Sequence, residues 1–145
     1  IRDKLVTGVQ TCALPICNVG WSNFQPSYST TTTNVNATGT LISTASTADS
    51  ATTTASGVMV YENSSGTATL GTDLKAYFSA DNGSNWTEAA SYGSTINFNG
   101  ASKKLVKLGK TTGLTSGTQM KLKAEWANQA TGTKVTRLHG WAINY

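Results

Sequence analysis

The chain has 145 residues, a formal net charge of +4 and only 12% charged residues, and it is rich in serine, threonine, asparagine and glycine. This length suits a single domain that can bury a core without disulfides or metal. The mild basic excess excludes the dense basic stripe of a nucleic-acid-binding protein. No apolar run approaches the thickness of a bilayer, which excludes a transmembrane helix. The composition is typical of extracellular or virion proteins and predicts an all-β fold.

The first segment is expected to be foreign to the fold. Residues 1–16 read IRDKLVTGVQTCALPI and, followed by Cys17, resemble the in-frame translation of a sequencing-library adapter. Such segments have to be set aside before a fold is considered. We therefore expect residues 1–17 to be an adapter-derived artefact and the natural chain to be truncated at its N-terminus; the alternative is a natural strand over LVTGVQ. Under the adapter interpretation, Cys12 and Cys17 predict no disulfide, metal or thiol chemistry.

The domain itself is predicted over residues 37–145, after a lead-in or linker over residues 18–36. Its start is rich in serine and threonine and is open to two interpretations. It is either a linker or glycosylated stalk, or a strand, because threonine favours strands and an apolar Leu-Ile pair lies within it. We predict a strand over residues 38–46.

Further short strands follow at roughly ten-residue spacing, separated by turns rich in glycine, asparagine and serine. Helices are disfavoured because these residues recur throughout the chain. The expected strands span residues 57–62, 73–80, 85–89, 95–98, 104–108, 119–127 and 134–142. This pattern predicts an antiparallel β-sandwich, jelly-roll-like, with seven or eight strands.

Alternation of apolar and polar residues predicts which side of each strand faces the core. In the strand over residues 73–80, the inward side chains are expected to be Leu74, Ala76 and Phe78. In the strand over residues 119–127, they are expected to be Met120, Leu122, Ala124 and Trp126. The alternation changes phase in the last strand, and Gly140 is the natural place there for a bulge.

One turn carries a specific motif. Residues 79–86, SADNGSNW, fit the pattern Ser-x-Asp-x-Gly-x-x-Trp and resemble the Asp-box hairpin of sialidases and other secreted β proteins. Asp81 is expected to accept backbone N–H bonds, Gly83 to supply a positive φ, and Trp86 to fold over the hairpin. In families that carry this motif it is a folding device remote from catalysis. The resemblance therefore implies a structural role for Ser79, Asp81, Gly83 and Trp86.

No arrangement of residues predicts catalysis. A calcium loop formed by Asp81, Asn82 and Asn85 is an alternative to the structural turn, but few carboxylates lie nearby in the sequence. A glycosidase pair would have to come from Asp49, Glu62, Asp73, Asp81, Glu88 and Glu125. The lone His139 is expected to be packed or hydrogen-bonded in the last strand. The chain has no nucleophile elbow, phosphate loop or dinucleotide motif, so we predict a protein that is not an enzyme and has no cofactor or metal.

Four strings in the C-terminal half carry a family resemblance. In order, GTATLGTDLKAYFSADNGSNWTEA, KKLVKLGKT, TSGTQMKLKAEWANQ and TRLHGWAINY resemble the C-terminal repeats of tail-fibre and other virion structural proteins of tailed phages. The resemblance covers residues 37–145 and rests on the order of the strings. It implies a virion location in the tail, a homo-oligomer with a trimer favoured, and a contribution to host-surface attachment.

Binding of a host glycan is the open functional question. The candidate glycan-binding residues are Tyr77, Tyr92, Trp141 and Tyr145, because exposed aromatic rings stack on the apolar faces of sugars. The alternative role for these rings is to cap sheet edges or to line subunit contacts. The alternative function is a carbohydrate-binding module of a secreted bacterial glycoside hydrolase, which would be extracellular. Neither interpretation involves nucleic acid or a membrane.

Overall fold

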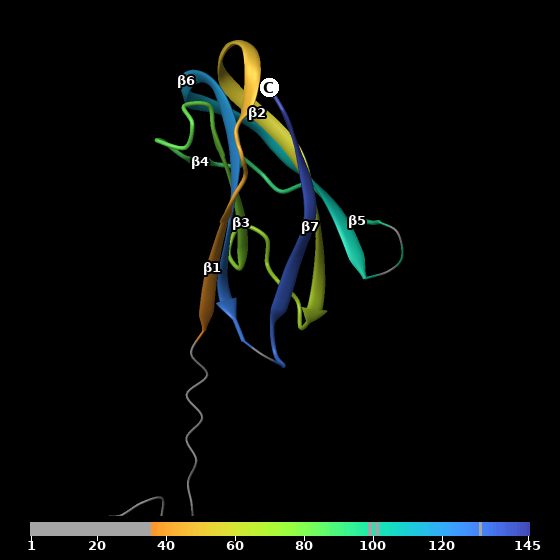
Figure 1. Cartoon of the computed structure of the whole chain (residues 1–145). Helices are drawn as coiled ribbons and strands as arrows, with labels where there is room; N and C mark the ends of the chain where they lie inside the picture. The colour runs from red at the N-terminus through yellow and green to blue at the C-terminus, as the bar shows by residue number, and fades with distance from the viewer. Residues whose placement is uncertain (1–35, 99, 101, 131) are drawn as a thin grey trace, which may run out of the picture. The chain divides into compact units, whose positions relative to one another are not determined.

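The structure, a computed structural model, describes residues 36–98, 100, 102–130 and 132–145, and within these ranges every regular element is a strand (Figure 1). The strands are β1 (Ala37–Ile42), β2 (Ser46–Ser65), β3 (Leu74–Ser79), β4 (Thr87–Glu88), β5 (Ile96–Asn97), β6 (Lys103–Gln129) and β7 (Val135–Asn144). All strand pairs are antiparallel. The predicted all-β antiparallel sandwich with seven or eight strands is confirmed. The adapter-like segment and almost all of the lead-in lie outside the described residues.

The seven strands form one continuous sheet that folds into two layers because β6 belongs to both. The C-terminal part of β6 lies between β1 and β3, and β4 pairs with β3; we call this layer the β3 sheet. The N-terminal part of β6 lies between β5 and β2, and β7 pairs with β2; we call this layer the β2 sheet. Figure 1 shows β6 curving from one layer into the other. No helix that could cross a membrane occurs in the described part of the chain.

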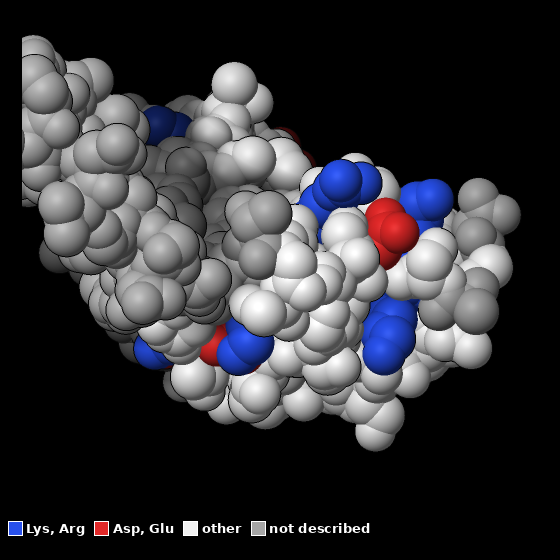
Figure 2. All heavy atoms as spheres, turned by 90° about the horizontal axis from the view of Figure 1, so that it is seen from below, with Lys and Arg blue, Asp and Glu red and all other residues white. Residues whose placement is uncertain are grey.

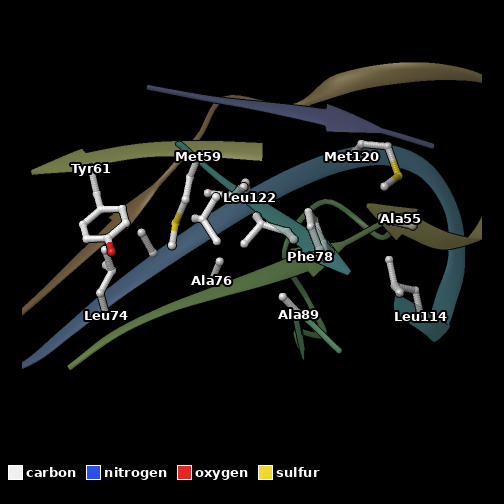
Figure 3. Packing of buried hydrophobic residues seen from close by; sticks show 14 of the residues in the cluster. Ala55, Met59, Tyr61, Leu74, Ala76, Phe78, Ala89, Leu114, Met120 and Leu122 are labelled. Atoms are coloured by element: carbon white, nitrogen blue, oxygen red, sulfur yellow. The ribbon is translucent and has the colours of Figure 1, made fainter. Parts of the chain in front are cut away.

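The hydrophobic core lies between the two layers (Figure 3). The β3 sheet and the bend of β6 contribute the buried side chains Leu74, Ala76, Phe78, Met120, Leu122 and Ala124, as the alternation predicted. The β2 sheet contributes Ala55, Met59, Tyr61, Val106 and Leu108. Because residues two positions apart in a strand face the same way, each layer presents an almost continuous apolar surface to the other.

Trp126 differs from the prediction, because it is only half-buried. It pairs with Leu74, the first residue of β3, and with Gly39 on β1, so it lies near the end of the β3 sheet. Its ring packs against the core from that end. Its indole N–H is buried without a hydrogen-bond partner in the part of the chain that the structure describes.

Two strands are much longer than predicted. The expected strands 104–108 and 119–127 are parts of the 27-residue β6, and the expected strand 57–62 is the end of the 20-residue β2. The glycines between them form a bend instead of a turn: Gly113 has a φ of 77°, and the register with β2 shifts there while pairing continues on both sides. From Ser46 onward the Ser/Thr-rich stretch is therefore a strand, and the linker or stalk interpretation is wrong for this part.

The predicted bulge at Gly140 is confirmed. Val60 pairs with Gly140, whereas the next residue, Tyr61, pairs with Leu138, so His139 is an extra residue in β7. The His139 Nε2 atom lies 2.8 Å from Glu62 Oε2 on the adjacent strand. His139, which lies in the last strand, is thus hydrogen-bonded, as expected.

Candidate functional site

Two of the four candidate aromatic residues, Trp141 and Tyr145, line the same groove. Trp141 pairs with the core residue Met59, which places it on the inner side of β7, at the edge of the β2 sheet. Trp141 and Tyr145 remain 38% and 44% exposed. The groove has a volume of about 280 Å³, and we call it the edge groove. Its other lining residues are Ser43, Thr44, Ala45, Ser46, Met120, Ala142 and Ile143.

The wall opposite the aromatic rings is the short link between β1 and β2. Backbone and side chain of Ser43 both anchor this link to Leu122: Ser43 N–H donates to the Leu122 carbonyl at 2.9 Å, and Ser43 Oγ accepts from Leu122 N–H at 3.0 Å. Ser46 Oγ and the Tyr145 hydroxyl are 2.8 Å apart and join the two walls. The buried Met120 gives the groove an apolar floor. An apolar floor, aromatic rings and a few hydroxyls are what sugar-binding sites use.

Tyr77 lies elsewhere, on the outer face of the β3 sheet. Lys123 on β6 pairs with it, and the Lys123 ammonium lies 4.2 Å from the centre of the Tyr77 ring and 5.2 Å from that of Trp86. The same ammonium is 2.8 Å from Glu125 Oε1. Burial, followed by the hydrogen bond with Glu125, raises the pKa of Tyr77 to about 12. One face of the Tyr77 ring is therefore occupied by a cation–π contact within the protein.

Tyr92 is packed against the core and acts as a structural tie. Its hydroxyl accepts the Ala76 N–H bond at 2.8 Å and lies 3.3 Å from Glu88 Oε1. Its ring also lies beside Gly71, which has a φ of 80° and would have no room for a side chain without displacing it. Burial is the main reason that the pKa of Tyr92 is raised. The geometry separates Tyr77 and Tyr92 from the edge groove, and Tyr92 does not offer an open ring face as the sequence interpretation required.

The hairpin over residues 79–86 is held by side-chain bonds to Asp81. Ser79 Oγ donates to Asp81 Oδ1 at 2.7 Å, and Asn85 donates its backbone N–H to Oδ1 at 3.0 Å and its amide to Oδ2 at 2.7 Å. The hydrogen bond from Ser79, followed by those from Asn85, lowers the pKa of Asp81 to about 2. Both carboxylate oxygens are thus engaged inside the turn, which favours a structural role over the calcium-loop alternative.

The backbone of this turn explains the glycine and the tryptophan of the motif. Asn82 and Gly83 have φ values of 61° and 88°, a region that glycine adopts without strain. The Trp86 ring lies 3.0 Å from where a Cβ on Gly83 would be. These contacts agree with the expected turn, while membership of the Asp-box class stays a prediction.

Replacing Asp81 with alanine is expected to lower the free energy of unfolding by about 1–2 kcal/mol, because the Asn85 N–H and the Ser79 hydroxyl would lose their acceptor. Urea denaturation followed by circular dichroism measures the change. Asp49→Ala is the matched control, since Asp49 is an exposed carboxylate on β2 and its loss should change stability by less than about 0.5 kcal/mol. Equal stability of the two variants would show that the bonds to Asp81 do not hold the turn.

Asp73 is a buried polar residue with a structural role that the sequence did not predict. The sequence analysis named it only as one of six acids that could form a glycosidase pair. It accepts hydrogen bonds from Thr69 N–H at 2.8 Å, from Asn128 Nδ2 at 2.9 Å and from the Lys134 ammonium at 2.8 Å. The Lys134 contact is the largest cause that lowers the pKa of Asp73 to about 2. Asp73 therefore connects the loop before β3 with the end of β6 and the turn into β7. The sequence does contain a sign of this role. Asp73 directly follows Gly71 and Thr72 in a turn, and an aspartate in a turn often accepts hydrogen bonds from nearby backbone N–H groups.

Three of the other acidic residues, Glu62, Glu88 and Glu125, contact bases on separate parts of the sandwich, whereas Asp49 is exposed. Lys75 pairs with Glu88 at 3.3 Å and Lys123 with Glu125 on the β3 sheet, whereas Glu62 contacts His139 on the β2 sheet. Across the ranges that the structure describes, no three His, Cys, Asp or Glu side chains gather into a metal-binding group. The edge groove is where the geometry brings two of the predicted glycan-binding residues, Trp141 and Tyr145, together.

No family model matches the sequence, and no curated protein and no solved structure matches it significantly.

Proposed function

We propose that this chain is a non-catalytic module of a phage tail fibre or similar virion protein, which contributes to host-surface attachment by binding a glycan in the edge groove. The observation that carries the proposal is the pair of half-exposed rings, Trp141 and Tyr145, in one groove with the hydroxyls of Ser43, Thr44 and Ser46. The resemblance of the C-terminal strings to tail-fibre repeats supplies the virion context.

The groove suits a pyranose ring for three physical reasons. The indole and phenol rings offer flat apolar surface, on which the C–H groups of a sugar can stack. The Tyr145 hydroxyl is already held by Ser46, so little rotamer freedom remains to be lost when a ligand binds. The hydroxyls of the β1–β2 link provide partners for sugar hydroxyls on the opposite wall.

A carbohydrate-binding module of a secreted bacterial glycoside hydrolase is the second candidate, because the edge groove would serve it equally well. The two candidates differ in what the module is attached to and in assembly. The fibre proposal includes a homo-oligomer, with a trimer favoured, in which identical copies would present several grooves to one surface.

The proposal predicts that Trp141→Ala weakens glycan binding strongly. On a glycan array the wild-type chain should bind at least one class of sugar, and the variant should bind it about tenfold more weakly or not at all, as removal of a stacking ring costs about 1.4 kcal/mol. Isothermal titration with the best array ligand quantifies the loss. Ile96→Ala is the control, because Ile96 is also exposed and apolar but lies on β5, outside the groove. The proposal would be rejected if the wild-type chain bound no glycan on the array, or if Trp141→Ala bound as strongly as wild type.

A further inference from the structure

A second hollow lies on the outer face of the β2 sheet, across β7 from the edge groove. Its volume is about 450 Å³. Its lining residues are Ser56, Gly57, Val58, Lys107, Leu108, Gly109, Lys110, Ala142, Ile143 and Asn144. Ala142 and Ile143 line both hollows, so the two sites adjoin along the C-terminal part of β7. We call this second site the lysine hollow.

The floor of the lysine hollow is apolar and shallow. Val58 on β2 pairs with Lys107 on one side and with Ala142 on the other, so these three residues form one row across three strands. Ala142 has a short side chain, which leaves space above this row. In the next row on the same face, two positions along the strands, Ser56 pairs with Asn144, whose amide is 3.4 Å from Ser56 Oγ. The floor therefore ends in an amide and a hydroxyl group.

A bulge in β6 brings two lysines to the same face. Leu108 and Thr111 are both buried although they are three positions apart, and the register with β2 shifts between them. The extra residue lets Lys107 and Lys110 both project outward. The bulge is fixed because Gly109 N–H donates to Ser91 O at 2.8 Å and Thr111 Oγ1 accepts from Ala90 N–H at 3.0 Å.

The charge of this surface favours an anionic ligand. Lys107 and Lys110 are exposed, and neither forms an ion pair with any residue in the described ranges. Glu62, an acid that faces outward on the same sheet, already contacts His139. In the view from below, by contrast, the clearly visible acidic side chains lie beside basic ones (Figure 2). The ligand that fits an apolar floor, two ammonium groups and an amide has a carboxylate, an apolar face and hydroxyls.

We infer that the lysine hollow binds a carboxylated sugar, such as a uronic acid residue. The carboxylate would lie between the ammonium groups of Lys107 and Lys110, the ring would cover Val58 and Ala142, and Asn144 would bond a ring hydroxyl. This inference rests on the proposed function, because the ligand is then an acidic glycan that crosses the end of β7 and fills both sites.

The test is an NMR titration of the ¹⁵N-labelled chain with digalacturonate and with its dimethyl ester. Digalacturonate should shift the amide signals of Val58 and Ala142, and its affinity should fall as salt is raised. The variant with Lys107→Gln and Lys110→Gln should bind it about tenfold more weakly, as expected for the loss of two exposed ion pairs. The dimethyl ester should bind both proteins as weakly as digalacturonate binds the double variant. Unchanged spectra of the free variant verify its fold.

Lys103→Gln is the matched control. Lys103 lies opposite Glu62 in the pairing of β6 with β2, four positions along β2 from Val58. Its affinity for digalacturonate should stay within about twofold of wild type. An equal loss in Lys103→Gln, equal binding of the ester, or no binding of digalacturonate would overturn the inference. The proposed function would survive each of these results if a neutral glycan still bound in a Trp141-dependent manner, so the two failures are distinguishable.

Discussion

Replacing Phe78 with alanine should lower the free energy of unfolding by about 4 kcal/mol. Phe78 is fully buried, and Figure 3 shows it projecting from β3 into the side-chain layer that contains Met59 and Leu122. Its ring lies 3.5 Å from where a Cβ on Gly57 would be, so it spans the full gap between the two layers. The alanine variant would lose the transfer free energy of the ring and leave a cavity that the rigid strands cannot close.

The control for this variant is Phe98→Ala. Phe98 is 46% exposed and follows β5, so its loss removes the same atoms from a site that water already reaches. Urea denaturation should place Phe98→Ala within about 1 kcal/mol of wild type. Similar midpoints for the two variants would mean that the core does not lie between the two layers.

Replacing Asp73 with alanine should cost about 3 kcal/mol, because it leaves the Lys134 ammonium, the Asn128 amide and the Thr69 N–H without their shared acceptor. The Asp73 side chain is almost fully buried, whereas that of Lys134 is partly exposed, so water compensates part of the loss on the lysine side. Asp73→Asn retains acceptor oxygen but removes the charge, and its stability should fall between those of wild type and Asp73→Ala. An unchanged midpoint for Asp73→Ala would contradict this role.

The same residue predicts the acid sensitivity of the fold. The pKa of Asp73 falls from 3.8 to about 2 on folding, so the unfolded chain takes up its proton first as the pH is lowered. The stabilisation is complete above pH 3.8 and is lost as the pH falls to about 2. Asp81 has the same direction of shift and acts in the same range. Thermal melts between pH 5 and pH 2 should therefore show a smaller decline in Tm for Asp73→Ala than for wild type.

The sequence predicts the strands of this fold better than their lengths. Alternation identified the inward residues of β3 and of the C-terminal part of β6 because burial imposes a period of two on any half-buried strand. It could not show that Gly113 lies in a bend, since a bend and a turn use the same residues. The difference depends on β2, which follows β6 through the bend and continues to pair with it.

The candidate site was partly predictable for a related reason. Aromatic residues are recognisable in the sequence, and the spacing of Trp141 and Tyr145 places both on one side of β7. The exposure of Tyr77 and Tyr92 depends on partners that no local pattern reveals. Lys123 reaches Tyr77 through cross-strand register, and Tyr92 reaches the backbone of Ala76 from a loop. The two lysines of the lysine hollow share a face only because of a bulge whose position follows from pairing with β2.

The passage of β6 through both layers has a mechanical consequence. A sandwich whose layers are joined only by loops can open like a book, one layer moving away from the other. Here such opening would have to straighten β6 and its partner β2 at the bend near Gly113, because both strands pass through it while paired. Tension that enters at β1 and leaves at β7 is therefore carried in shear along paired strands, the direction in which many hydrogen bonds resist together.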